Sequence, residues 1–174
     1  MRLGLFDSGI GGFTILKKVI EICPNSSFLY LADTARLPYG VKTSDEIRQI
    51  AEEISSWFSN QEIDAFLIAC NTTNAIALDV IKNKLDVPVF DLIESASLTI
   101  QDSRVGVLAT PSTVKTKAYT RSILNSKPET FVIEQSCPEF VPMIEMNRIN
   151  SDKITDVAIR YLKPLLEKNI ESLI

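Results

Sequence analysis

Short apolar runs alternate with stretches of helical periodicity along this chain, and no other feature constrains its fold as strongly. Buried strands are expected at residues 3–6, 28–31, 65–69, 87–90, 105–109 and 131–133, because each run is short, apolar and bounded by turn or polar residues. Helices are expected at residues 13–22, 44–58, 74–85, 112–124 and 152–167. Strands that alternate with helices form a parallel sheet covered on both faces, so the sequence predicts an α/β fold.

Local signals mark some of the helix ends. Ser44 is expected to cap the helix that opens there, with Ile47 as its first buried residue. Pro164, near the end of the last helix, predicts a kink or an early stop. Residues 169–174 then read as the beginning of a new strand.

An internal repeat indicates two related lobes. Residues 2–6 align with residues 104–108, and residues 63–67 align with residues 170–174. With a crossover at residues 94–103, we predict lobes at residues 1–93 and 94–174, related by a pseudo-twofold axis and with the active site in the cleft between them. The second alignment has an offset of 107 residues, which places the counterpart of Cys70 at position 177, beyond the last residue of the sequence.

Composition excludes several classes of function. A net charge of −4 provides no basic face for nucleic acid. No apolar run has the length of a membrane span, and the N-terminus does not read as a signal peptide. The three cysteines lie far apart, which fits a reducing cytoplasm better than a disulfide framework. The absence of histidine excludes a Ser-His or Cys-His pair and a histidine-ligated metal from these 174 residues.

A glycine-rich turn follows the first strand. Residues 7–12 read Asp-Ser-Gly-Ile-Gly-Gly and open the first helix, where free backbone N–H groups can bind an anion. Thr14 stands where the dinucleotide motif needs glycine, and the lysine of a phosphate-binding loop is absent. The glycines alone are explained by a tight turn. They do not explain Asp7, which is expected to face a cleft at the carboxyl end of its strand.

Cys70 lies between a strand and a helix. The positive end of the following helix is expected to lower the pKa of its thiol, and Asn71, Thr72 and Thr73 add donors suited to a carboxylate. The alternative is a buried structural cysteine followed by a helix cap.

Other candidates have weaker contexts. Tyr39 and Gly40 lie in a loop that could close over a ligand, or in an ordinary Pro-x-Gly turn. Glu145 is a single acid after an apolar stretch, which on its own reads as a solvated loop residue. Cys23 and Cys137 each precede a proline and are interpreted as structural.

Taken together and in this order, these segments resemble the glutamate racemases. The family's Asp-Ser-Gly-x-Gly-Gly start is matched by residues 7–12, and its Asp-Thr-x-x-x-Pro-Tyr-Gly segment by residues 33–40. Ala-Cys-Asn-Thr is matched by residues 69–72 and Leu-Ala-Thr-x-x-Thr-Val by residues 108–114. Cys-Pro-x-Phe-Val-Pro-x-x-Glu is matched by residues 137–145. The likeness runs from residue 2 to the end of the sequence.

The resemblance implies a cytoplasmic enzyme that interconverts L- and D-glutamate without any cofactor or metal and supplies D-glutamate for peptidoglycan. One thiolate removes the α-proton and a thiol on the opposite face returns a proton. Cys70 is then one of the two thiols, Asp7 its assistant, and Glu145 the assistant of the opposite thiol. The residues implied to bind the substrate are Asp7, Ser8, Tyr39, Gly40, Asn71, Thr72 and Thr113. A homodimer is compatible with this interpretation.

One family motif is missing. Gly-Cys-Thr-His-Tyr-Pro, which supplies the second thiol, does not occur in this sequence. We interpret this as truncation, with both lobes incomplete, and expect the 174 residues alone to be inactive. The first lobe would then lack its C-terminal helices. Cys137 is not expected to replace the second thiol, because the family has a cysteine there in addition to its catalytic pair. The alternatives are an aspartate or hydantoin racemase, a related decarboxylase, a non-catalytic carboxylate-binding remnant, and a phosphate-binding enzyme.

Overall fold

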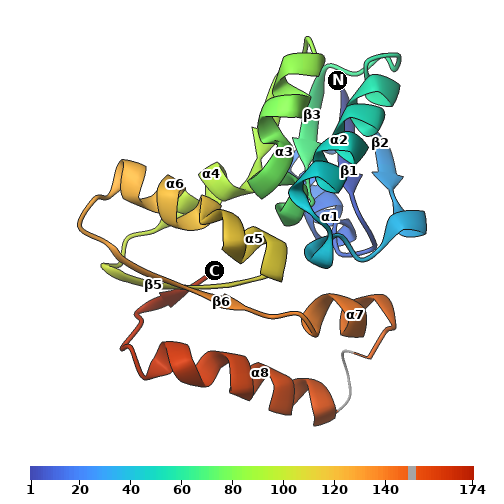
Figure 1. Ribbon diagram of the computed structural model, residues 1–174. Coiled ribbons are helices and arrows are strands. Elements are labelled where there is room, and N and C mark those ends of the chain that lie inside the picture. Colours follow the sequence, from blue (N-terminus) through green and yellow to red (C-terminus); the bar gives the residue numbers. More distant parts are fainter. Residues whose placement is uncertain (149–151) are drawn as a thin grey trace. The chain divides into compact units, whose positions relative to one another are not determined.

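The computed structural model describes residues 1–148 and 152–174, and it forms two compact units (Figure 1). Unit 1 comprises Met1–Leu92 and unit 2 comprises Ile93–Ile174. Each unit contains one parallel sheet. The predicted α/β fold with parallel sheets flanked by helices is confirmed.

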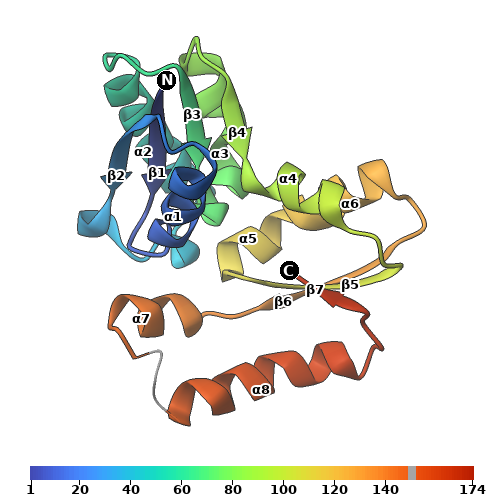
Figure 2. The same cartoon turned by 180° about the vertical axis from the view of Figure 1, so that it is seen from behind.

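The sheet of unit 1 has the strand order β2-β1-β3-β4. Its elements are β1 (Arg2–Asp7), α1 (Phe13–Ile22), β2 (Ser27–Ala32), the 3-10 helices η1 (Thr34–Arg36) and η2 (Tyr39–Val41), α2 (Ser44–Phe58), β3 (Ala65–Ile68), α3 (Asn71–Lys84) and β4 (Val89–Asp91). Helices α2 and α3 cover one face of the sheet, and α1 lies on the other (Figures 1 and 2). Because β1 and β3 are central, their carboxyl ends lie next to each other.

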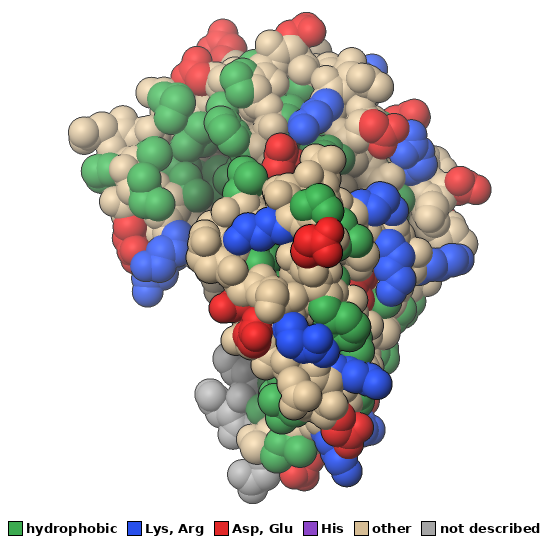
Figure 3. Space-filling view, turned by 90° about the vertical axis from the view of Figure 1, so that its left-hand side faces the viewer, with side chains coloured by type: hydrophobic (Ala, Val, Ile, Leu, Met, Phe, Trp, Pro, Cys, Tyr) green, Lys and Arg blue, Asp and Glu red, His purple; other side chains and the backbone are tan. Residues whose placement is uncertain are grey.

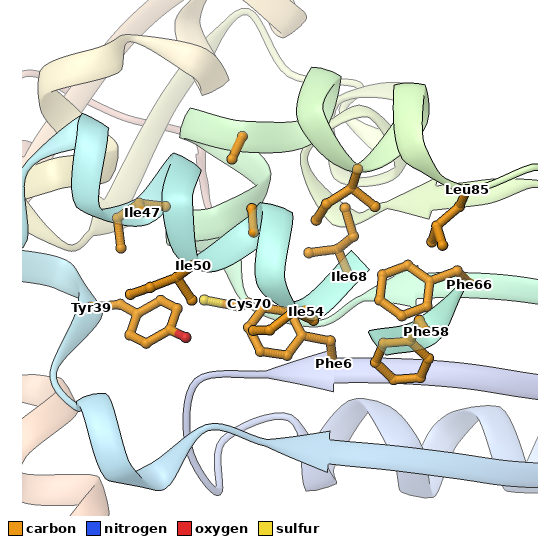
Figure 4. Packing of buried hydrophobic residues seen from close by; sticks show 13 residues of the cluster. Phe6, Tyr39, Ile47, Ile50, Ile54, Phe58, Phe66, Ile68, Cys70 and Leu85 are labelled. Carbon is orange, nitrogen blue, oxygen red and sulfur yellow. The ribbon is translucent and has the colours of Figure 1, made fainter. Parts of the chain in front are cut away.

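The main core of unit 1 lies between α2, α3 and the sheet. Ile47, Ile54 and Phe58 of α2 are almost fully buried in one cluster, which also contains Phe66 of β3 and Cys70 (Figure 4). Burial of each large apolar side chain stabilises the fold by about 1.5–3 kcal/mol. This cluster therefore holds the start of α3, where Cys70 lies, against the sheet.

The start of α2 differs from the sequence-based expectation. Thr43, not Ser44, caps the helix: its Oγ1 accepts a hydrogen bond from the N–H of Glu46 at 3.3 Å, and its own N–H donates to Glu46 Oε2 at 2.8 Å. This reciprocal capping box requires a Glu three residues after the cap, a requirement that Thr43 meets. The prediction of Ser44 as the cap was wrong.

The opposite face of this sheet is less covered. Leu16 and Val19 of α1 pack against its apolar cluster, whereas Phe90 of β4, whose strand neighbour is Leu67, is 55% exposed. Phe13 and Ile20 of α1 are also exposed. Figure 3 shows apolar side chains gathered on part of the molecular surface.

The sheet of unit 2 has the strand order β6-β5-β7. After α4 (Leu92–Thr99), which occupies much of the predicted crossover, its elements are β5 (Arg104–Ala109), α5 (Pro111–Thr116), α6 (Ala118–Ser126), β6 (Phe131–Ser136), α7 (Phe140–Glu145), α8 (Asp152–Leu166) and β7 (Ser172–Leu173). Helix α8 contains Pro164 and ends soon after it. The predicted new strand is present as β7.

Two helices differ from their predicted extents. The single helix expected at residues 112–124 is two helices, because Lys117 adopts a left-handed conformation with φ 57° between α5 and α6. Helix α3 begins at Asn71, earlier than the expected residue 74. The earlier start makes Cys70 the N-cap residue of α3.

The internal repeat is visible in the packing of the two central strands. A Cβ atom at Gly4 would lie 2.9 Å from Ile63 and 3.0 Å from both Phe58 and Phe66. A Cβ atom at Gly106 would lie 2.8 Å from Ile170, 3.2 Å from Leu165 and 3.3 Å from Leu173. The corresponding neighbours are all offset by 107 residues, the offset of the sequence repeat.

The strand register follows the same correspondence. Leu3 pairs with Ala65 in unit 1, and Val105 pairs with Ser172 in unit 2. Within the described residues, no helix is both long and apolar enough to cross a membrane.

Candidate active site

The glycine-rich turn places Asp7 at the carboxyl end of β1. Asp7 is buried, and its Oδ2 accepts a hydrogen bond of 2.7 Å from the N–H of Gly12. A Cβ atom at Gly12 would lie 2.5 Å from Asp7 Cβ and would also collide with the Tyr30 hydroxyl. Glycine at position 12 is therefore required by close packing, and the turn fixes the Asp7 carboxylate.

Cys70 follows the neighbouring strand β3 and meets the same turn. Its Sγ donates to Ser8 Oγ at 3.5 Å, and the N–H of Ala69 donates to the carbonyl oxygen of Phe6 at 2.8 Å. Only 4% of Cys70 is exposed. The structure thus brings together the predicted residues Asp7, Ser8 and Cys70.

The pKa of the Cys70 thiol is raised, not lowered as the sequence predicted. Burial is the main cause, and the negative charge of Asp7 adds to it. The Ser8 hydroxyl and the hydroxyl and N–H of Thr73 act in the opposite direction, because they favour the thiolate. The Thr73 hydroxyl makes no other hydrogen bond among the described residues, so it remains available to the sulfur.

Asn71 and Thr72 open α3. Thr72 is buried and Asn71 is exposed. The positive end of the α3 dipole favours an anion beside Cys70. A carboxylate-bearing molecule with its Cα near the sulfur matches this arrangement.

Tyr39 and Gly40 are buried in η2 and do not form an open loop. The Tyr39 side chain packs in the main core of unit 1, with its ring centroid 6.2 Å from that of Phe6 (Figure 4). Its hydroxyl donates to Asp33 Oδ2 in a short hydrogen bond. Burial and the Asp33 carboxylate raise the pKa of Tyr39 well above its usual range, so it is a neutral donor.

Asp33, which lies in the Asp-Thr-x-x-x-Pro-Tyr-Gly segment but was not among the predicted site residues, is a further candidate for the site. Its Oδ2 also accepts from Arg36 Nε at 2.5 Å, and Arg36 Nη1 donates to Glu53 Oε2 at 2.5 Å. Asp33 therefore anchors the segment that carries Tyr39. The signal was available, since Asp33 directly follows a strand just as Asp7 ends one.

Unit 2 holds the other predicted binding residue, Thr113. It is fully buried in α5, and its N–H donates to Thr110 Oγ1 at 3.3 Å, which caps that helix. The two hydroxyl groups lie 2.9 Å apart. Thr110, which the sequence analysis placed only in a motif, therefore orients Thr113 at the carboxyl end of β5.

Glu145 is the last residue of α7 and is half-buried. Cys137 is buried beside Met143 and Tyr161, and its Sγ donates to the carbonyl oxygen of Gln135 at 3.4 Å. Burial raises the pKa of Cys137 to about 11. A neutral thiol in an apolar cluster fits a structural cysteine. All three cysteines are free, and the described residues contain no cluster of His, Cys, Asp or Glu arranged to hold a metal ion.

Comparison with known proteins gives a consistent result. The family model of the Asp/Glu/hydantoin racemases matches residues 11–174. The glutamate racemase of Prochlorococcus marinus (strain NATL1A) is 78% identical over 174 residues, which are 100% of this chain and 66% of that protein. The chain thus spans slightly less than two thirds of the length of this curated relative.

Solved structures show the same likeness. Glutamate racemase from Francisella tularensis in complex with D-glutamate superposes with a TM-score of 0.94 at 39% identity, covering 99% of this chain and 66% of that one. Escherichia coli glutamate racemase, in complex with L-glutamate and the activator UDP-MurNAc-Ala, gives a TM-score of 0.76 at 26% identity, covering 94% and 63%.

Proposed function

The chain belongs to the Asp/Glu/hydantoin racemase family, and from this premise we propose that it is the larger part of a cofactor-independent glutamate racemase. The observation that carries the proposal is the buried Cys70 thiol, hydrogen-bonded to Ser8 at 3.5 Å and close enough to Asp7 for the carboxylate to raise its pKa. Its relatives at high identity are glutamate racemases, and the solved neighbours include complexes with both glutamate enantiomers.

The first step is activation of the thiol. The raised pKa of Cys70 means that it needs a base, and we propose that Asp7 accepts the thiol proton. The donors around the sulfur, Ser8 and Thr73, then stabilise the thiolate. Substrate binding adds to this effect by bringing the ammonium group of glutamate near the single negative charge that Cys70 and Asp7 share.

The second step is proton transfer at Cα. The Cys70 thiolate takes the α-proton, the electron pair of the C–H bond moves onto Cα and its carboxylate, and a thiol on the opposite face donates its proton to Cα. We assign the opposite thiol to position 177 of the longer protein, where the repeat places the counterpart of Cys70. Glu145 of unit 2 serves that thiol as Asp7 serves Cys70.

Substrate binding uses neutral donors because the protein is acidic overall. We propose that the first turn of α3, with Asn71 and Thr72, holds one carboxylate together with Ser8. Tyr39 and Gly40 shape the wall beside it, and Thr113 contributes from unit 2. The enzyme would supply D-glutamate for peptidoglycan in the cytoplasm, and a homodimer is compatible with this proposal.

The test is exchange of the α-proton in D2O. The protein encoded by the complete gene, free of pyridoxal phosphate and metal, should incorporate deuterium into both L- and D-glutamate. Cys70→Ser should lower the exchange rate by roughly 10²–10⁴-fold, the usual contribution of a positioned acid or base. No exchange with glutamate, or full exchange by the Cys70→Ser variant, would reject the proposal. Exchange faster with aspartate than with glutamate would reassign the substrate.

A further inference from the structure

Cys70 occupies the N-cap position of α3 without performing the usual task of a cap residue. Ser, Thr, Asp and Asn fix the start of a helix by accepting a hydrogen bond from its first turn. The Cys70 thiol instead donates to Ser8 Oγ at 3.5 Å, and the N–H of Thr73 in the first turn favours the sulfur in its thiolate form. The Cys70 backbone has the extended angles φ −82° and ψ 108°. While the thiol is protonated, the turn is held mainly by another group.

That group is the side-chain amide of Asn74. Its Nδ2 donates to the carbonyl oxygen of Ile68 at 2.7 Å and to that of Cys70 at 3.2 Å. The backbone N–H of Asn74 also donates to the Cys70 carbonyl oxygen at 2.9 Å. One residue therefore ties the end of β3 and the cap of α3 together, on both sides of the cysteine.

The burial of Asn74 is unfavourable for the stability of the fold, so stability alone does not explain why an amide stands at position 74. Asn74 is 4% exposed, and its Oδ1 is buried without a hydrogen-bond partner among the described residues. An unpaired buried acceptor destabilises a folded protein. An apolar side chain of similar size would avoid this cost but would lose both bonds of Nδ2.

A backbone kink at Ala77 separates the first turns of α3 from the rest of the helix. Ala77 has non-helical angles, φ −136° and ψ 22°, and Arg48 Nη1 donates to the carbonyl oxygen of Ile76 at 3.1 Å. Arg48 also binds Asp79 through two hydrogen bonds of 2.8 and 2.7 Å. Because α2 holds the helix at this kink, the geometry of the turn before it depends on local contacts such as those of Asn74.

We propose that Asn74 is a positioning residue for the proposed racemase: its amide holds the strand-to-helix turn so that Cys70 Sγ stays buried beside Ser8 and Asp7. The inference rests on the proposed function for its meaning in catalysis, but the positioning itself can be measured without glutamate. Among the described residues, Asp7 at the end of β1 is the charged group that raises the pKa of this thiol, and Tyr39 of η2 is a titratable group whose own pKa the Cys70 charge raises.

The test is the pH dependence of alkylation of Cys70 by iodoacetamide, followed by mass spectrometry of its peptide so that other cysteines do not interfere. In Asn74→Leu the turn loosens and the sulfur becomes more exposed to water. The pKa of Cys70 should then fall towards that of free cysteine, and alkylation at pH 8 should become roughly tenfold faster. Asn83→Leu, an exposed position in the same helix, is the matched control and should behave as wild type.

Asn74→Ser provides a second variant if the leucine impairs folding. It should also lower the pKa of Cys70 and speed its alkylation. In the complete enzyme, Asn74→Leu should lower kcat for deuterium exchange by roughly tenfold with little change in KM, since a small misplacement of a reacting group mainly affects the chemical step. Alkylation profiles of both Asn74 variants that coincide with wild type would overturn the inference. Absence of exchange in wild type would reject the proposed function and leave the alkylation result to decide the role of Asn74.

Discussion

The central strand of unit 1 ends at Asp7, whose carbonyl oxygen accepts a hydrogen bond of 3.0 Å from the N–H of Asp33. The central strand of unit 2 ends at Ala109, whose carbonyl oxygen accepts one of 2.8 Å from the N–H of Cys137. The two backbones therefore agree at the carboxyl ends of their strands. The side chains do not: one unit places carboxylates there and the other places a methyl group and a neutral thiol.

The difference continues along the next segment. Tyr39 follows Asp33 at the same distance along the chain as Met143 follows Cys137, and both side chains are buried. Tyr39 donates to Asp33, whereas Met143 packs against Cys137 in an apolar cluster. The same backbone arrangement thus supports a polar network in unit 1 and apolar packing in unit 2. Backbone register and site chemistry are separate properties of this molecule.

The largest expected effect tests the correspondence between the cores of the two units. Phe58 and Leu165 are fully buried and occupy corresponding positions under the central glycines. Phe58→Ala should lower the free energy of unfolding by about 3–5 kcal/mol and Leu165→Ala by about 2–5 kcal/mol, because each leaves a cavity. Hydrogen exchange resolved by residue should show each loss in its own unit. A loss smaller than about 1 kcal/mol in either unit would contradict the correspondence.

The matching glycines give the next effect. Gly4→Ala adds a methyl group 3.0 Å from the buried Phe58 and Phe66, and Gly106→Ala adds one 2.8 Å from the half-buried Ile170 and 3.2 Å from the buried Leu165. Each should cost about 1–3 kcal/mol in urea unfolding. Gly11 is a control from the same chain, because a Cβ atom there would lie at an ordinary 3.7 Å from Asp7. Equal stability of Gly11→Ala and Gly4→Ala would show that close packing does not explain the glycine in β1.

Replacing Asp33 and Cys137 tests the contrast between the polar network of unit 1 and the apolar cluster of unit 2. Asp33→Asn weakens the hydrogen bonds of Tyr39 and Arg36, and we expect a loss of about 1–3 kcal/mol that is confined to unit 1. Cys137→Val, which keeps an apolar side chain among apolar neighbours, should change the stability of unit 2 by less than about 1.5 kcal/mol. Chemical denaturation with hydrogen-exchange readout measures both. A larger loss at position 137 would reverse the proposed contrast.

The next effect concerns the pH dependence of the stability of unit 2. Burial raises the pKa of Cys137 in the folded state from 9.0 to about 11, so the folded state keeps a proton that the unfolded state has lost. Its contribution to stability is therefore complete below pH 9 and is lost as pH rises towards 11. Cys137→Val should make stability less dependent on pH in this window, whereas wild type should lose about 1–3 kcal/mol. Identical pH profiles would exclude this thiol as the cause.

In unit 1, Asp7→Asn should lower the pKa of Cys70, because it removes a negative charge that opposes the thiolate. Cys137 has no such carboxylate among the groups that shift its pKa, so its alkylation profile should not respond. Iodoacetamide titration of both peptides in one sample makes the comparison. A raised pKa of Cys70 in Asp7→Asn would show that hydrogen bonding by Asp7, and not its charge, is the main influence.

Much of the fold could be read from the chain because its signals are local. Helix α2 has its apolar residues at helical spacing and was predicted with its observed bounds. The break at Lys117 could not be predicted in this way. There the start of α6 is held by Glu134 of β6, whose Oε1 accepts from the N–H of Thr120 at 3.0 Å. That contact joins residues 14 positions apart in sequence, and it adds to the local hydrogen bond of 3.1 Å from the N–H of Ala118 to Thr116 Oγ1.

The candidate site shows the same division. Strand-end positions identified Asp7 and Cys70, because parallel strands with helices between them place their carboxyl ends at one edge. Asp33 and Asn74 were not selected. Their roles depend on what their side chains contact, Tyr39 and Arg36 in one case and the carbonyl oxygens of Ile68 and Cys70 in the other.

By itself the sequence determined the alternation of strands with the longer helices, the repeat with its offset, and the two turns that meet in unit 1, since periodicity and turn chemistry act over a few residues. Only the tertiary structure decided the state of the Cys70 thiol. The helix start alone would lower its pKa, but burial under α2 and the nearby charge of Asp7 outweigh that effect. Desolvation and charge depend on distances across the fold, and those distances are set when the chain packs.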